Sequence, residues 1–367
     1  MAGWPRLMPR RPLAAIFMLG GALFAAESLA DAPWKFAVSG DSRNCGDVVM
    51  PSIAAGARAN GAVFYWHLGD LRAIHDIDED YRTQHPTAAF GDYLAGAWLD
   101  FERNQIEAFG SMPFFLGIGN HETVPPKTRA EFVATFARWL DAAPIRDQRS
   151  ADDAHDHTLR PYYHWRRDGV DFINLDNATA DQFDAAQLAW LKKVLQNDRA
   201  DAAVRALVVG MHEALPESLA RGHSMSDSAI MQAAGLQAYA ALLEVRKAKP
   251  VYVLASHSHF VMENVFDTPY WQAHGGVLPG WIIGTGGAVR YALPPLPPLP
   301  PQASRAALAR TYVYGYLLAT VSPPGTDDQQ PIRFAFQEVT EAAVPAEVAQ
   351  RYGPELLHFC YQENARE

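Results

Sequence analysis

Short polar clusters rich in Asp, Asn and His follow the apolar stretches of this chain in five places. In chain order they are Asp41, Gly69-Asp70, Gly119-Asn120-His121-Glu122, His212 and His257-Ser258-His259. Carboxylates, an amide oxygen and imidazoles are ligands that divalent metal ions accept in proteins. If the apolar stretches are neighbouring strands, the clusters converge at one edge of a sheet and could form a centre for metal-assisted hydrolysis.

The run at residues 119–122 is more specific than the other clusters. The side-chain oxygen of Asn120 can ligate a hard cation without adding charge, and His121 can donate a proton to a leaving oxygen. Glu122 could hold His121 in its proton-donating tautomer. A capped turn with a satisfied histidine accounts for the same four residues equally well.

Three further clusters offer imidazoles and a bridging carboxylate. His257 and His259 are two residues apart, so on an extended strand both side chains point to one side and could reach different ions. His212 follows another apolar stretch, and Asp70 could bridge two cations held about 3.5–4 Å apart. A lone His or Gly-Asp pair is common, but their combination in a chain with 13 His favours a metal centre.

Apolar stretches and helical patterns alternate along the chain. Strands are predicted at residues 34–38, 62–68, 113–118, 204–209, 251–254, 281–283, 311–320 and 332–336. Helices are predicted at 48–59, at 98–109, and after Asp184 where leucines recur with helical spacing. This alternation is typical of α/β proteins, in which ligands bind beyond the carboxyl ends of the strands.

In order and composition, the five clusters resemble the pattern of calcineurin-like metallophosphoesterases. That pattern runs Asp-x-His, Gly-Asp, Gly-Asn-His-Asp/Glu, a single His and Gly-His-x-His, and it matches residues 36–259. The runs at 187–191 and 284–288 also resemble family features. The resemblance implies a four-layer αββα sandwich, in which two mixed β-sheets are flanked by helices. It also implies two divalent metal ions, for which Fe, Mn and Zn all suit the ligands.

The resemblance also implies a role for each matching residue. The first metal ion would be held by Asp41, Asp70 and His259, and the second by Asp70, Asn120, His212 and His257. His121 would be the general acid. A metal-bound hydroxide would attack the phosphorus of a phosphomonoester or phosphodiester.

The chain departs from the pattern at Arg43, which stands where Asp-x-His has its His. Arginine stays protonated and cannot ligate a metal ion. Purple acid phosphatases also lack that His, but they place a Tyr three residues after Gly-Asp, where this chain has Ala73.

Three interpretations of Arg43 stay open. Another ligand could replace the missing one, with His75, Asp76 and Asp78 as candidates. Alternatively, the first ion binds weakly and Arg43 binds the substrate phosphate as a catalytic residue. In the third interpretation, the positive charge of Arg43 replaces that ion. We favour intact phosphate chemistry with a perturbed first metal site. Arg72 is a further phosphate-binding candidate, although a surface salt bridge accounts better for it.

A second function is compatible with the same residues. Because Arg43 removes one expected ligand, the chain could instead be a non-catalytic protein of this fold that binds a phosphorylated ligand or a protein partner. A hydrolase outside phosphorus chemistry finds little support, because the chain has no Gly-x-Ser-x-Gly elbow.

The first 30 residues have the features of a signal peptide. Three arginines precede an uncharged apolar run that is short for a membrane span, and Ser28-Leu29-Ala30 has the form of a cleavage site. We therefore expect a periplasmic or secreted protein without a membrane span in the mature chain. The net charge of −10 argues against a nucleic-acid-binding surface.

We expect one phosphoesterase domain at residues 31–340 and a C-terminal tail at 341–367 that packs on it. Insertions are expected near 141–160, 266–280 and 291–304, the last a Pro-Leu run read as a stiff surface connector. Cys45 and Cys360 are the two cysteines, and either a disulfide or two separate buried thiols fits them.

Overall fold

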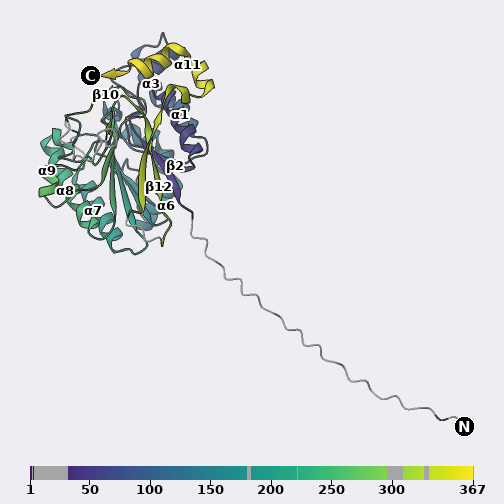
Figure 1. Ribbon diagram of the computed structural model, residues 1–367, viewed down its shortest axis with the longest axis vertical. Coiled ribbons are helices and arrows are strands. Elements are labelled where there is room, and N and C mark those ends of the chain that lie inside the picture. The colour runs from purple at the N-terminus through teal and green to yellow at the C-terminus, as the bar shows by residue number, and fades with distance from the viewer. Residues whose placement is uncertain are drawn as a thin grey trace, which may run out of the picture.

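Two mixed β-sheets lie face to face in the computed structural model, and helices cover their outer faces (Figure 1). The structure describes residues 32–179, 183–220, 222–295, 309–325 and 330–366, together with residues 1 and 3. The predicted signal peptide at 1–30 therefore lies almost wholly outside the described residues.

The first sheet has five strands. Their spatial order is β13 (Ile332–Val339), β12 (Tyr314–Val321), β1 (Trp34–Ser39), β2 (Ala62–His67) and β3 (Phe114–Leu116). Strands β1, β2 and β3 are parallel, and β12 runs antiparallel to β1. The carboxyl ends of these three strands therefore meet at one edge, and Asp41, Asp70 and Asn120 follow them within two to four residues.

The second sheet has seven strands. Their order is β11 (Ala309–Arg310), β8 (Val261–Glu263), β9 (Gly280–Ile283), β7 (Val251–Ala255), β6 (Ala206–Met211), β5 (Val170–Asn174) and β4 (Tyr163–Arg167). Strands β5, β6, β7 and β9 are parallel. A short parallel pair joins β10 (Arg290–Tyr291) to β14 (Ala365–Arg366).

Aromatic side chains fill the space between the two sheets. Phe36 and Phe64 of the first sheet stack with ring centroids 5.1 Å apart, and both meet Phe172 of the second sheet edge-on. At Gly210 a side chain would overlap the indole of Trp66, so glycine lets the sheets approach there. This interface is the core that sets the two ligand-bearing edges side by side.

Strand β6 shows why helices must cover the outer face. Ala206 and Val208 face the other sheet, whereas Leu207, Val209 and Met211 face away from it, and all are buried. Helices α7 (Ala185–Ala200) and α8 (Ala229–Arg246) cover this second face. The expected cap of α7 is present, because the carboxylate of Asp184 accepts a hydrogen bond from the Gln187 amide.

Helices on the outside of the five-stranded sheet complete a fourth layer. They include α1 (Gly46–Ala59), α3 (Phe90–Phe101) and α11 (Ala346–His358), which gather on one side of the molecule in Figure 1. The four-layer αββα prediction is thus confirmed. Within the described residues, the other helices are α2 (Glu79–Gln84), α4 (Arg129–Thr135), α5 (Ala137–Leu140), α6 (Ala143–Asp152) and α9 (Pro269–Ala273). Single turns lie at Glu102–Ile106, Glu107–Phe109, Asn120–Thr123, Met225–Asp227, Glu341–Ala343 and Phe359–Glu363.

Two of the three expected insertions are more ordered than their sequence suggested. The segment at 141–160 contains α6, which buries Ile145, and the segment at 266–280 contains α9, which buries Trp271 against Tyr239. Within each helix, one buried apolar side chain provides the anchor. The third segment is described only at 291–295, so the rest of the Pro-Leu run lies outside the described residues.

A disulfide joins the C-terminal segment to the first helix. The Cα atoms of Cys45 and Cys360 are 5.8 Å apart, and their sulfurs are bonded. Of the two alternatives for the cysteines, the structure therefore has the disulfide. Across the described part of the chain, no helix has the length and apolar character needed to cross a bilayer.

Candidate metal centre

Three of the predicted ligands sit at sharp turns where their strands end. Asp41, Asp70 and His257 have φ values of 60°, 60° and 62°, in the left-handed region that costs a side-chain-bearing residue about 1–2 kcal/mol. Backbone hydrogen bonds hold the turns against one another, from Asp41 to Gly69 and from Gly40 to Ile283. Left-handed residues gathered in this way are typical of functional sites.

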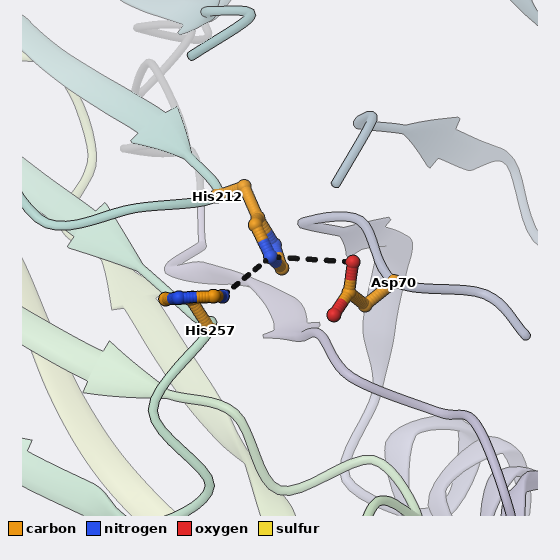
Figure 2. A group of neighbouring side chains, drawn as sticks. All are labelled: Asp70, His212 and His257. Atoms are coloured by element: carbon orange, nitrogen blue, oxygen red, sulfur yellow. Dashed lines mark hydrogen bonds and ion pairs between the residues drawn. The ribbon is translucent and has the colours of Figure 1, made fainter. Parts of the chain in front are cut away.

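Asp70, His212 and His257 form the tightest group (Figure 2). Their ligand atoms lie within 4.8 Å of one another. His212 Nε2 is 3.3 Å from Asp70 Oδ1 and 3.0 Å from His257 Nδ1. The side-chain oxygen of Asn120 is 3.0 Å from the same His212 nitrogen. Four residues predicted as ligands of the second metal ion therefore converge from four strand ends.

Hydrogen bonds aim the imidazole of His212 at this group. Its Nδ1 donates to the carbonyl of Leu68 at 3.0 Å, with Ser256 Oγ equally close. Because a carbonyl oxygen only accepts, Nδ1 carries the proton and Nε2 faces Asp70. A backbone carbonyl behind the ring is the arrangement that commonly orients metal-binding histidines.

The two facing histidines have opposite pKa shifts. Burial opposes a charge on His212, but the carboxylates of Asp70 and Asp41 outweigh burial and raise its pKa to about 10. Burial lowers the pKa of His257 to about 3, and the neighbouring charge of His212 acts in the same direction. Burial also opposes ionisation of Asp70, yet His121, His212 and Arg43 hold its pKa well below the ordinary value. The group is thus arranged around an anionic oxygen and attracts positive charge.

A second set of predicted ligands adjoins the first. Asp41 Oδ1 lies 3.3 Å from His259 Nε2, and Asp41 Oδ2 accepts a hydrogen bond from the His257 amide at 2.7 Å. His259 Nδ1 donates to the carbonyl of Val289 at 2.6 Å, which turns Nε2 inward. Arg43 approaches both sets, with Nη2 3.2 Å from His259 Nε2 and Nε 3.7 Å from Asp70 Oδ2.

His121 lies at the edge of the same group and is almost fully buried. Its Nε2 is 3.6 Å from Asp70 Oδ2, and its Nδ1 donates to the carbonyl of Ala73 at 2.5 Å. The expectation that Glu122 orients this ring was wrong. Glu122 instead accepts hydrogen bonds from the amides of Gly119, Asp70 and Leu71, and so pins the two turns together.

The position of Arg72, in the loop after Asp70, contradicts both interpretations of this residue. This side chain is neither at the phosphate site nor on the surface. It is fully buried, and its guanidinium contacts four carboxylates, those of Asp47, Asp78, Asp80 and Asp100. Arg72 is therefore a structural centre beneath the ligand loop.

The same loop gives no support to a replacement metal ligand. Asp78 accepts from the Asn44 amide and from the Tyr93 hydroxyl, and Asp76 has a side chain that is 72% exposed. His75 is exposed and lies against His121, with their Nδ1 atoms 3.3 Å apart.

Two aromatic residues line the site that were not predicted from the sequence. The ring of His223 lies 5.3 Å from that of His257, and Tyr291 stacks on His259 at 4.1 Å. His223 and Tyr291 are themselves 5.4 Å apart. Neither follows a strand as the five clusters do, so no local pattern marks them.

The donor set fits a divalent cation. Asp41 Oδ1 and Asp70 Oδ2 are buried carboxylate oxygens without a hydrogen-bond partner, and such oxygens are costly unless a cation pairs with them. Two imidazole nitrogens and an amide oxygen face the same space. This mixture of oxygen and nitrogen ligands suits Zn, Mn or Fe.

Similarity to known proteins lies in the fold and not in the sequence. No protein-family model matches the sequence, and no curated protein matches it. A purple acid phosphatase from yellow lupin (Lupinus luteus) seeds superposes with a TM-score of 0.50 at 13% identity, over 84% of this chain and 52% of its own. A structure of PhoD superposes with a TM-score of 0.49 at 15% identity, over 89% of this chain and 77% of its own. A dimetal phosphatase from Danio rerio superposes with a TM-score of 0.46 at 13% identity, over 84% of this chain and 96% of its own.

The chain therefore shares its fold with a purple acid phosphatase. It spans about half the length of the lupin protein. The structure adds a candidate metal site beyond the carboxyl ends of the strands, the edge at which open α/β sheets bind their ligands.

Proposed function

We propose that this chain is an exported, metal-dependent phosphoesterase that hydrolyses a phosphomonoester or phosphodiester. The observation that carries the proposal is the convergence of Asp70, Asn120, His212 and His257 on one point from four strand ends. These four residues would hold a divalent cation. Such a cation supplies Lewis-acid activation of both the phosphoryl group and the attacking water.

Arg43 is the residue that we propose to bind the substrate phosphate. Its guanidinium stays charged, and its side chain is only 13% exposed, so its N–H groups can donate to phosphoryl oxygens in a largely dry site. Its Nε has no hydrogen-bond partner within the protein. A bound phosphate would satisfy that donor.

His121 is the proposed general acid. The Ala73 carbonyl holds Nδ1, so a proton for the leaving oxygen would come from Nε2, which points at the group around Asp70. Burial lowers the pKa of His121, and the positive charge of Arg43 acts in the same direction, although Asp70 opposes both. A lowered pKa makes the imidazolium a ready proton donor, and the charge of a bound phosphate would favour its protonated form.

Export to the periplasm or the medium is supported by two features. Residues 1–30 have the charge and apolar pattern of a signal peptide. The disulfide between Cys45 and Cys360 is stable in an oxidising compartment and rare in a reducing one. Mass spectrometry of the exported protein would test this by locating its N-terminus, which we expect at Asp31.

The test of the activity is a phosphoester panel with variants of two kinds. Purified protein loaded with Mn²⁺, Zn²⁺ or Fe²⁺ is assayed on aryl phosphomonoesters and phosphodiesters. We expect His121→Ala to lower turnover by about 10²–10⁴-fold while metal content stays unchanged. His212→Ala should lose both its turnover and its bound metal. His155→Ala, in an exposed loop, is the matched control and should change neither. Metal-loaded protein that cleaves no phosphoester would contradict the proposal.

A binding protein is the second candidate, because Arg43 stands among the ligands of the expected first metal ion. It would bind a phosphorylated ligand through Arg43 without turning it over. Calorimetry with inorganic phosphate distinguishes the two functions. Phosphate binding that Arg43→Met abolishes, in protein that shows no turnover with any metal, would favour the binder.

A further inference from the structure

The guanidinium of Arg43 lies among the three side chains expected to hold the first metal ion. Its Nη2 is 3.2 Å from His259 Nε2, and its Nε is 3.7 Å from Asp70 Oδ2. Asp41 completes the set, with Oδ1 3.3 Å from the same His259 nitrogen. A permanent positive charge therefore stands where these residues would otherwise surround a cation.

Hydrogen bonding at His259 removes a metal ligand from this set. Its Nδ1 donates to the carbonyl of Val289, so the neutral ring has its lone pair on Nε2. That nitrogen is the one that Arg43 Nη2 approaches, and it can accept a hydrogen bond from the guanidinium. A lone pair used in this way is not available to a metal ion.

The loop that carries Arg43 is held on both sides. The Ser42 amide donates to the Asp70 carbonyl at 3.0 Å, and the Cys45 amide donates to the carbonyls of Arg43 and Gly287. Cys45 is in turn bonded to Cys360. Because the backbone on each side of Arg43 is held by hydrogen bonds, the fold fixes the point from which this side chain enters the pocket.

Charge balance leads to the same conclusion. Two of the three side chains expected to hold the first metal ion are carboxylates, those of Asp41 and Asp70, with Asp70 beside Arg43 and Asp41 beside His259. One divalent cation together with Arg43 already outweighs these two charges. A second dication beside the guanidinium would add repulsion at close range in a buried site, where screening is weak.

We propose that the centre holds one metal ion and that Arg43 is a built-in cation in place of the other. The inference rests on the proposed function for the identity of the resident site, which is Asp70, Asn120, His212 and His257. Within the described residues, the group that meets the geometry of a metal site belongs to that set. Arg43 binds phosphoryl oxygens by hydrogen bonds but activates no water, so it acts on substrate alignment.

The test is metal stoichiometry, measured by elemental analysis and native mass spectrometry after loading with Mn²⁺ or Zn²⁺ and dialysis. We expect one ion per chain in the natural protein. Arg43→His supplies an imidazole and removes the charge, so it should bind two ions. Adding His259→Ala to that variant should return the count to one.

Two single variants keep the inference open to refutation if Arg43→His fails to fold. His259→Ala should retain the ion, whereas His212→Ala should lose it, although both histidines are buried in one pocket. Two ions in the natural protein, or loss of the ion in His259→Ala, would overturn the role of Arg43 and leave the proposed function standing. A natural protein that holds no ion under any loading would overturn both.

Discussion

The buried arginine beneath the ligand loop offers a sharp test of the structure. Arg72 Nη2 contacts Asp47 Oδ1 at 2.5 Å, Arg72 Nη1 contacts Asp80 Oδ1 at 2.9 Å, and Asp100 is also in contact. The substitution Arg72→Met keeps much of the side-chain volume and removes the charge. It would leave several buried carboxylates facing one another without a cation.

The size of the effect follows from the burial of the cluster. Removing one partner of a buried ion pair costs about 3–5 kcal/mol. Arg72 has more than one close partner, but burial and neighbouring carboxylates raise the pKa values of Asp80 and Asp100, so protonation can relieve part of the cost. We therefore expect a loss of about 4 kcal/mol at pH 7.5, a large share of a typical folding free energy of about 5–15 kcal/mol.

The pH dependence gives the prediction a second readout. Without Arg72, the pKa values of Asp80 and Asp100 rise further in the folded chain and stay near 4 in the unfolded chain. A raised carboxyl pKa stabilises the fold at low pH, and this contribution is lost as the pH increases. The deficit of Arg72→Met relative to the natural protein should thus be smaller at pH 5 than at pH 7.5.

Urea unfolding at the two pH values is the assay, with Arg82→Met as the matched control. Arg82 is 49% exposed and lies 3.6 Å from Asp76 and from Glu79, so its loss should cost less than about 1 kcal/mol. Equal unfolding midpoints for the two variants would refute the placement of Arg72 in the interior.

Three more predictions concern parts of the fold around the site. Cys45→Ser opens a disulfide that spans 315 residues and should lower the free energy of unfolding by about 4–6 kcal/mol, measured by denaturant unfolding without reductant. Burial opposes a charge on His164, but Asp171 raises its pKa to about 10 from an ordinary 6.5. The free energy of unfolding should therefore fall by about 3–5 kcal/mol as the pH rises from 6.5 to 10. In urea unfolding at several pH values, His164→Gln should remove this pH dependence. A side chain at Gly119 would overlap the backbone and carboxylate of Asp70, so Gly119→Ala should weaken metal binding in calorimetry, and unchanged affinity would count against the close approach of the two turns.

The strands and their ends could be read from the sequence because buried parallel strands are continuous apolar runs. Residues 62–68 and 251–254 were predicted as such runs, and the structure has β2 and β7 there. Once the strands are parallel neighbours, the residues after them must meet at one edge. That is why Asp70 and His257 could be expected in one site before their distances were known.

Contacts that depend on side-chain direction could not be read in the same way. Arg72 lies two residues after Asp70, yet it turns away from the site because carboxylates distant in sequence, such as Asp47 and Asp100, surround it. Glu122 was expected to touch the adjacent His121, but it caps backbone amides instead. His223 reaches the site from an irregular segment and Tyr291 from the two-residue strand β10, and neither segment is long enough to give a periodic signal.

Anomalous X-ray diffraction from Mn²⁺- or Zn²⁺-loaded crystals tests the central claim most directly. We predict one peak, about 2.0–2.3 Å from His212 Nε2, His257 Nδ1 and an oxygen of Asp70. Density for the Arg43 guanidinium should lie beside it, between His259 and Asp70. A peak elsewhere, or none at full loading, would contradict the account.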